Sequence, residues 1–435
     1  MMVTEMPHPV ALPGSPPSIR PSPSRRAGGL LRAVGGALFL VAASIGTSGP
    51  AAMVQAADAE ASPSVDAGLM AEALRIIGER YVDDEALTTE NLTAGAIRGM
   101  VEALGDEGHT EYLTAEEYAA EQDALAGRVL GIGVVLDQRA RTPLVISVID
   151  GSPADRAGVR AGDIIASVDG VETSRLPLDD LAGLVRGTAG SRVRIGVERP
   201  GEPDLLDLSI VREDVAIEAA SWARVPGSDV AVVRIVQFSQ AAGERVREAI
   251  VAALSGGAGG LVLDLRGNPG GFVDEALVVA SAFLDGGVAY QEADRDESVR
   301  DVFIPDGRVI SANVPVSVLV DYATASSAEI LAAALRDNGR AAIVGERTYG
   351  TGTVLNTFDL SDGSALKVGV RSWLTPAGEA VFRVGVEPDH EVTAGPGTAL
   401  LRPADLATMT AQGFNASDDL ALRRAVGLLE PLAAR

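Results

Sequence analysis

The chain of 435 residues contains no cysteine and only three histidines. The absence of cysteine excludes disulfides, thiol nucleophiles and cysteine-ligated zinc in one step. His8, His109 and His390 stand in unrelated sequence contexts, which argues against a histidine metal site and against a Ser/His/Asp triad. We therefore expect neither a metal ion nor a cofactor.

Positive charge and aromatic residues are also scarce. The chain has 36 Lys and Arg residues against 60 Asp and Glu residues, a formal net charge of −24, and only 4% aromatic residues. This balance argues against nucleic acid and against an anionic lipid surface as partners. The length alone suggests about three domains.

The first 57 residues read as a leader rather than as part of a fold. A Pro/Ser/Arg-rich stretch precedes the apolar run Ala33–Gly46, and V-Q-A at Val54–Ala56 suits a signal-peptidase cut. This pattern predicts export, to the cell envelope, the periplasm or the outside. The low-polarity span from Ala33 to Ala57 is also long enough for a single membrane anchor, so cleavage and anchoring stay alternatives.

The stretch Val316–Leu335 is the segment around which the chain is organised. Val316–Val320 predicts a buried strand and Ala328–Leu335 a helix, with a turn of mostly small residues between them. Such a turn puts Ser326 or Ser327 beside N–H groups at the positive end of the helix dipole, where an oxyanion is stabilised. The alternative is that these serines merely cap the helix.

Two flanking motifs favour a catalytic role for these serines over helix capping. The turn A-T-A-S-S-A-E-I is preceded by D-L-R-G-N-P-G-G and followed by G-E-R-T-Y-G-T-G-T-V. In this order the three segments resemble the carboxy-terminal processing peptidases, also called tail-specific proteases. The resemblance implies that Ser326, three residues before Glu329, is the nucleophile. It also implies an oxyanion hole made by the N–H groups of Gly270, Gly271 and Ser326 itself.

The chain departs from the family at the catalytic base. The family lysine corresponds here to Thr351, and the glutamine that orients it corresponds to Leu355. A threonine hydroxyl cannot take the proton of a serine near neutral pH, whereas a buried lysine can. Lys367 is the only lysine of the chain and becomes the leading candidate for the base. A carboxylate, Glu329 or Asp321, is the other candidate, because a strongly desolvated carboxylate is also a base.

Residues 127–213 form a compact β-rich module that resembles a PDZ domain, above all in the run from Gly151 to Gly170. The backbone amides of Gly131, Ile132, Gly133 and Val134 are expected to hold the carboxylate of a protein C-terminal tail, with the following strand pairing with the peptide. A PDZ fold with an inactive groove is the alternative.

The sequence thus predicts an α/β fold: a crotonase- or Clp-protease-like peptidase core with an inserted PDZ domain and a helical N-terminal cap. The expected function is an exported serine endopeptidase that recognises C-terminal tails and cleaves nearby. The alternative is a catalytically silent tail-binding scaffold of the cell envelope. The sequence leaves the natural substrate and the oligomeric state open. The expected boundaries are 1–57 for the leader, 58–126 for the cap, 127–213 for the PDZ domain and 214–435 for the core.

Overall fold

The structure is a computed structural model that describes residues 65–433 apart from 106–109, 140–141, 175, 177, 297, 396–397 and 399. The predicted leader, 1–57, lies outside the described residues. Contacts within the chain separate two compact units, Met1–Ile77 and Gly78–Arg435. No helix within the described ranges is long and apolar enough to cross a membrane.

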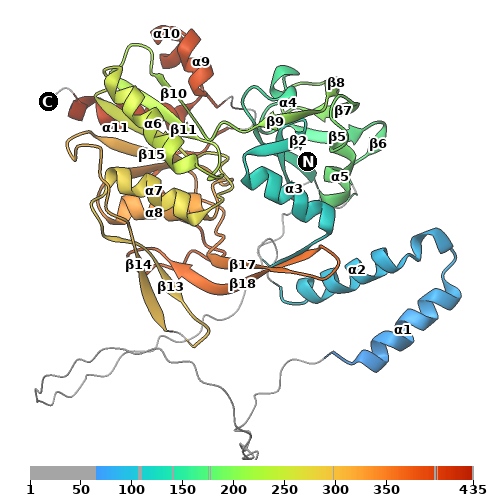
Figure 1. Ribbon diagram of the computed structural model, residues 1–435. Helices are drawn as coiled ribbons and strands as arrows, with labels where there is room; N and C mark the ends of the chain where they lie inside the picture. The colour runs from blue at the N-terminus through green and yellow to red at the C-terminus, as the bar shows by residue number, and fades with distance from the viewer. Residues whose placement is uncertain are drawn as a thin grey trace, which may run out of the picture. The chain divides into compact units, whose positions relative to one another are not determined.

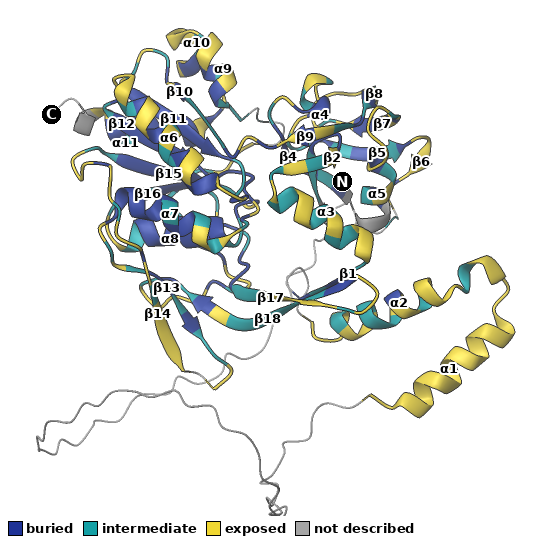
Figure 2. Ribbon diagram, viewed as in Figure 1, coloured by how far each residue is buried: buried dark blue, intermediate teal, exposed yellow. Residues whose placement is uncertain are grey.

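Helix α1 (Ala67–Arg80) contains the boundary between the two units, and none of its residues is buried. Its apolar side chains recur at helical spacing, as predicted for a helix, yet Leu69 is 64% and Leu74 53% exposed. Figure 2 shows this helix as exposed along its whole length.

The core of the second unit is a six-stranded sheet whose central strands are buried throughout. All residues of β11, β12 and β15 are buried, because parallel strands are covered on both faces, and their sequences are correspondingly almost continuous apolar runs. The strand predicted at Val316–Val320 is confirmed as β15. The strand order is β10 (Ala220–Arg224), β11 (Val230–Ile235), β12 (Gly260–Asp264), β15 (Val316–Val320), β16 (Ala342–Gly345) and β19 (His390–Glu391), with only β10 antiparallel to its neighbour.

Two groups of helices cover the two faces of this sheet (Figure 1). Alternate strand residues divide between them: Val233, Leu263 and Val318 pack in one cluster, whereas Val232 and Val262 pack in the other. An α/β core is thereby confirmed. The first cluster contains α6 (Ala242–Ser255), α7 (Val273–Phe283) and α8 (Ser327–Asp337), and the second contains α9 (Pro403–Thr408), α10 (Ala411–Asn415) and α11 (Leu420–Ala433).

A second sheet carries the segments on either side of the family's lysine position. Strand β17 starts two residues after Thr351 and forms a long hairpin with β18, which contains Lys367. Strand β1 joins the far edge of β18, so the N-terminal part of this unit is built onto the hairpin. The sheet comprises β1 (Glu111–Leu113), β18 (Ala365–Leu374), β13 (Val288–Ala293), β14 (Val299–Phe303) and β17 (Thr353–Asp359), and η1 (Asp84–Ala86), α2 (Thr89–Glu102) and α3 (Ala115–Leu125) precede or follow β1.

The PDZ module is an antiparallel sheet with two short helices. The chain enters and leaves it through a two-stranded ribbon, β2 (Arg128–Gly131) with β9 (Glu213–Ala216). The predicted carboxylate loop therefore lies between β2 and β3. The module contains β3 (Val134–Arg139), β4 (Thr142–Val148), α4 (Pro153–Arg156), β5 (Ile164–Val168), β6 (Val171–Glu172), α5 (Leu178–Val185), β7 (Arg192–Glu198) and β8 (Leu206–Val211).

Candidate active site

Ser326 lies at the turn between β15 and α8 in a strained backbone conformation. Its φ of 55° and ψ of −124° fall in a region that a side chain with a Cβ rarely adopts, at a cost of about 1–3 kcal/mol. Such strain persists only where the surrounding structure enforces it, which is typical of functional turns. Ser326 is half-buried, whereas Ser327 is fully buried and its hydroxyl has no hydrogen-bond partner among the described residues. Of the two serines, Ser326 is the more exposed.

The glycine loop after β12 lies against this turn. A Cβ on Gly270 would stand 2.7 Å from the Cβ of Ser326 and 3.1 Å from the backbone nitrogen of Ser327. Gly270 also has a φ of +99°, so both space and backbone conformation require glycine there. The two segments that the sequence motifs singled out therefore meet.

The hydrogen bonds of the loop change the predicted oxyanion hole. The N–H of Gly270 donates to the Asn268 Oδ1 at 2.8 Å, and the N–H of Ser326 donates to the Glu329 Oε2 at 2.8 Å. Both amides are occupied by these acceptors, so neither is free for a substrate oxyanion in this conformation. Among the described residues no acceptor is bonded to the N–H of Gly271 or of Ser327.

The Ser327 amide was missed by the sequence reasoning. The signal was present, because the first N–H groups of a helix have no intrahelical carbonyl to bind. The S-x-x-E spacing of Ser326 and Glu329 is likewise a capping-box pattern, which places the glutamate on the N–H of the serine. This pattern predicts that the N–H of Ser326 is occupied and that the N–H of Ser327 is the available donor.

Glu329 is a fully buried carboxylate that holds the active-site turns together. It accepts hydrogen bonds from the N–H groups of Ser326, Gly350 and Thr351 and from the hydroxyl of Thr348, at 2.5 to 3.0 Å. Burial raises the pKa of Glu329, and these four bonds offset only part of that effect. Four donors fill the acceptor positions of a carboxylate. The geometry makes Glu329 a structural acceptor rather than a base for Ser326.

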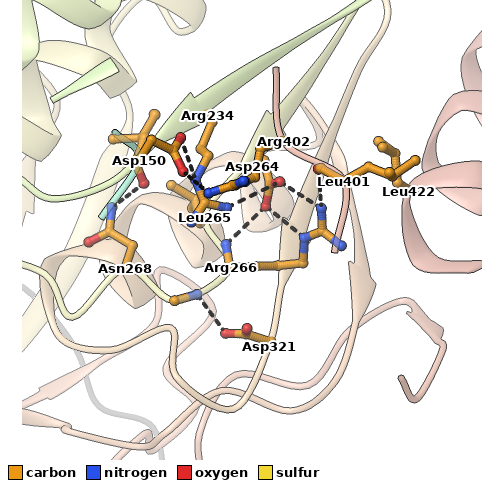
Figure 3. A network of polar contacts seen from close by, with 12 residues as sticks. Asp150, Arg234, Asp264, Leu265, Arg266, Asn268, Asp321, Leu401, Arg402 and Leu422 are labelled. Atoms are coloured by element: carbon orange, nitrogen blue, oxygen red, sulfur yellow. Dashed lines mark hydrogen bonds and ion pairs between the residues drawn. The ribbon is translucent and has the colours of Figure 1, made fainter. Parts of the chain in front are cut away.

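Asp321, the other candidate carboxylate, binds the two loops to each other. Its Oδ1 accepts from the N–H of Gly267 at 2.9 Å and from the N–H of Ala323 at 3.0 Å. Figure 3 shows Asp321 below the start of the glycine loop. Burial raises its pKa, and the bond from Gly267 lowers it in part. Its hydrogen bonds go to backbone and to Thr324, not to Ser326.

The glycine loop is anchored at its base by a buried arginine. Arg266 binds Asp264 through two nitrogens at 2.7 and 2.8 Å (Figure 3), and it binds Asp419 at 2.9 and 3.0 Å. All three side chains are 2% exposed or less. A buried charge of this kind is tolerated only when it is fully paired, so the residue preceding Gly267 is held in one place.

The partners of Lys367 argue against its role as the base. Its Nζ is bound by Glu111 at 2.8 Å and by Glu121 at 2.6 Å. Burial alone would lower the pKa of Lys367, but the two carboxylates outweigh burial and raise it. A lysine base needs a lowered pKa and a free lone pair directed at the serine. Lys367 instead ties β18 to β1 and α3.

The hydroxyl of Thr351, the residue that the sequence motif aligned with the family lysine, lies beside Ser326. Its Oγ1 is 3.2 Å from the backbone nitrogen of Ser326, and the residue is only 7% exposed. Leu355, at the glutamine position, is half-buried in β17 opposite Gly369. The structure thus brings Ser326, Thr351, Gly270 and Gly271 together and leaves Lys367 outside.

Two backbone hydrogen bonds fix the predicted carboxylate loop of the PDZ module. The carbonyls of Ile132 and Gly133 accept from the N–H groups of Ala154 and Ile149, at 2.8 and 2.9 Å. The Ile132 side chain is buried in the PDZ core. Because N–H and C=O of one trans peptide point in opposite directions, the Gly133 N–H is directed away from Ala154.

Comparison with known proteins identifies the class. The profile of peptidase family S41 matches residues 229–392 and that of the PDZ domain matches residues 144–199. Carboxyl-terminal-processing peptidase 2, chloroplastic, of Arabidopsis thaliana is 35% identical over 351 residues, which are 74% of this chain and 68% of that protein. Carboxy-terminal processing protease CtpA of Bacillus subtilis is 31% identical over 299 residues, which are 69% of this chain and 63% of that protein.

A solved structure agrees with these sequence relatives. The photosystem II D1 C-terminal processing protease superposes with a TM-score of 0.60 at 31% identity, covering 79% of this chain and 97% of that one. Fold and site thus define a PDZ-containing serine peptidase. The chain belongs to peptidase family S41, as one of its carboxy-terminal processing serine peptidases.

Replacing Lys367 by methionine should leave the cleavage rate within about twofold of the wild type and reduce stability. The folded-state pKa of Lys367 is raised, so its contribution is fully present below the ordinary value of 10.5 and is lost as pH rises through the folded-state pKa. Urea denaturation should show a stability difference at pH 8 that shrinks at strongly alkaline pH. A loss of activity of about 10²-fold in a folded variant would restore Lys367 as the base.

Proposed function

We propose that this chain is an exported peptidase that captures protein C-terminal tails in its PDZ module and cleaves them with Ser326. The observation that carries the proposal is the strained Ser326, half-buried at the start of α8 and packed against Gly270. The leader pattern at 1–57 supports export, which N-terminal sequencing of the mature protein tests.

The chemistry assigned to the site is acyl transfer. The Ser326 Oγ attacks the scissile carbonyl, and the developing oxyanion is met by the N–H groups of Ser327 and Gly271, which no described group occupies. The C–N bond then breaks, the serine proton passes to the leaving amine, and water releases the acyl group. Thr351 offers a hydroxyl where the family has an amine, so it orients neighbours but does not hold the proton.

Tail capture is supported by the position of the PDZ carboxylate loop. The loop joins β2 to β3, and β3 is the strand with which a bound peptide would pair. Its glycines have positive φ, 155° at Gly131 and 83° at Gly133, which lets successive amides converge on one anion.

Peptides with a free, apolar C-terminus should bind better than their amidated forms, because the loop amides recognise the carboxylate charge. The measurement is fluorescence anisotropy on the chain from Ala57 onward carrying Ser326→Ala, which prevents cleavage. Equal affinities for the two forms would contradict the assignment of this loop as the carboxylate-binding site. That result would not bear on cleavage, which is measured separately.

Alanine substitutions of the two serines should have different effects in a cleavage assay with an unfolded protein substrate. Ser326→Ala should abolish turnover while the melting temperature stays near that of the wild type. Ser327→Ala should retain most activity, because its buried hydroxyl has no partner and its amide is unchanged. If Ser327→Ala is the inactive variant, Ser326 is not the nucleophile.

A lysine at position 351 should accelerate cleavage. Thr351→Lys, alone or with Leu355→Gln, supplies an amine beside Ser326, and general-base catalysis is worth on the order of 10²-fold or more. Thr351→Met is the matched control, with similar length and no amine. If the wild type never cleaves and only the lysine variants do, the natural chain binds tails without cutting them. No gain in either lysine variant would contradict the assigned register of Thr351.

A further inference from the structure

Asn268 is a fully buried side chain of the glycine loop whose amide nitrogen and oxygen are both hydrogen-bonded. Its Nδ2 donates to the Ile235 carbonyl at 2.9 Å, and its Oδ1 accepts from the Gly270 N–H at 2.8 Å. Its own carbonyl accepts from the N–H of Ala325, the residue before the nucleophile, at 2.9 Å. One residue thus connects the end of β11, the glycine loop and the turn that carries Ser326.

The groups on both sides of Gly270 are hydrogen-bonded, so the peptide between Gly270 and Gly271 has one orientation. The Gly270 N–H is turned inward to Asn268, and the Gly270 carbonyl accepts from the N–H of Phe238 at 2.9 Å. Since N–H and C=O of a trans peptide oppose each other, the Gly271 N–H is directed away from Phe238. With no acceptor among the described residues, that amide is the one the loop offers to a ligand.

We propose that Asn268 is a positioning residue of the oxyanion hole: by holding Gly270 inward it makes Gly271, rather than Gly270, the amide that stabilises the oxyanion. The inference rests on the proposed function. Asn268 does not touch the substrate, and its effect is transmitted through one backbone peptide.

An asparagine suits this position because it donates on one side and accepts on the other. A protonated aspartic acid has the same arrangement, with its O–H toward Ile235 and its C=O toward Gly270. An ionised aspartate has no donor for the Ile235 carbonyl, and two acceptors then face each other without solvent. Asn268→Asp should therefore function when protonated and fail when ionised.

The experiment compares kcat and KM for Asn268→Ala, Asn268→Asp and the wild type between pH 5 and 8, each well below its melting temperature. Asn268→Ala should lower kcat on the order of 10²-fold, the scale of one oxyanion donor, with KM nearly unchanged. The kcat of Asn268→Asp, relative to the wild type, should rise as pH falls. Asn338→Asp is the matched control, because Asn338 also donates to a backbone carbonyl, that of Val288, and should show no such pH dependence.

A second readout separates this inference from the proposed function. A peptide boronic acid forms a tetrahedral adduct that uses the oxyanion hole, so Asn268→Ala should bind it on the order of 10²-fold more weakly while binding a C-terminal tail peptide as the wild type does. Failure of the wild type to cleave any protein would defeat the proposed function alone. Unchanged boronate affinity in folded Asn268→Ala, or a pH-independent ratio for Asn268→Asp, would overturn the role of Asn268.

Discussion

The active site depends on the burial of one carboxylate. Glu329 accepts four hydrogen bonds from two segments, the start of α8 and the turn at 348–351. A buried carboxylate is costly unless each of its acceptor positions is filled, so these segments cannot separate without exposing it or leaving it unpaired. The turn that carries Thr351 is therefore held beside Ser326 mainly by its backbone, through the N–H groups of Gly350 and Thr351.

Local pattern was sufficient for much of the fold and for the position of Ser326 at the start of α8. The apolar run at Val316–Val320 and the helix formers after it gave β15 and α8 almost to the residue. These features depend on periodicity and on short-range steric rules, which the sequence displays directly. Ser326 followed from a motif of neighbouring residues.

The base and the oxyanion donors depended on contacts that sequence spacing does not reveal. Lys367 is paired with Glu111 and Glu121, 256 and 246 residues earlier in the chain, so its raised pKa could not be read from its own strand. The Gly270 amide is occupied by Asn268, a side chain only two residues away. The two residues are close in sequence, but the orientation of the Asn268 side chain depends on Ile235, and that of the loop on α8.

The single lysine has a consequence for how this peptidase is studied. Of 36 basic residues only Lys367 carries a side-chain amine, and it is enclosed by two carboxylates that keep it protonated. Amine-directed reagents react with the neutral amine, so the folded protein should react with them very little apart from its N-terminus. An amine introduced anywhere else would stand out against this background. Its reactivity as a function of pH would report the electrostatic environment of that one location, without isotopes or further substitutions.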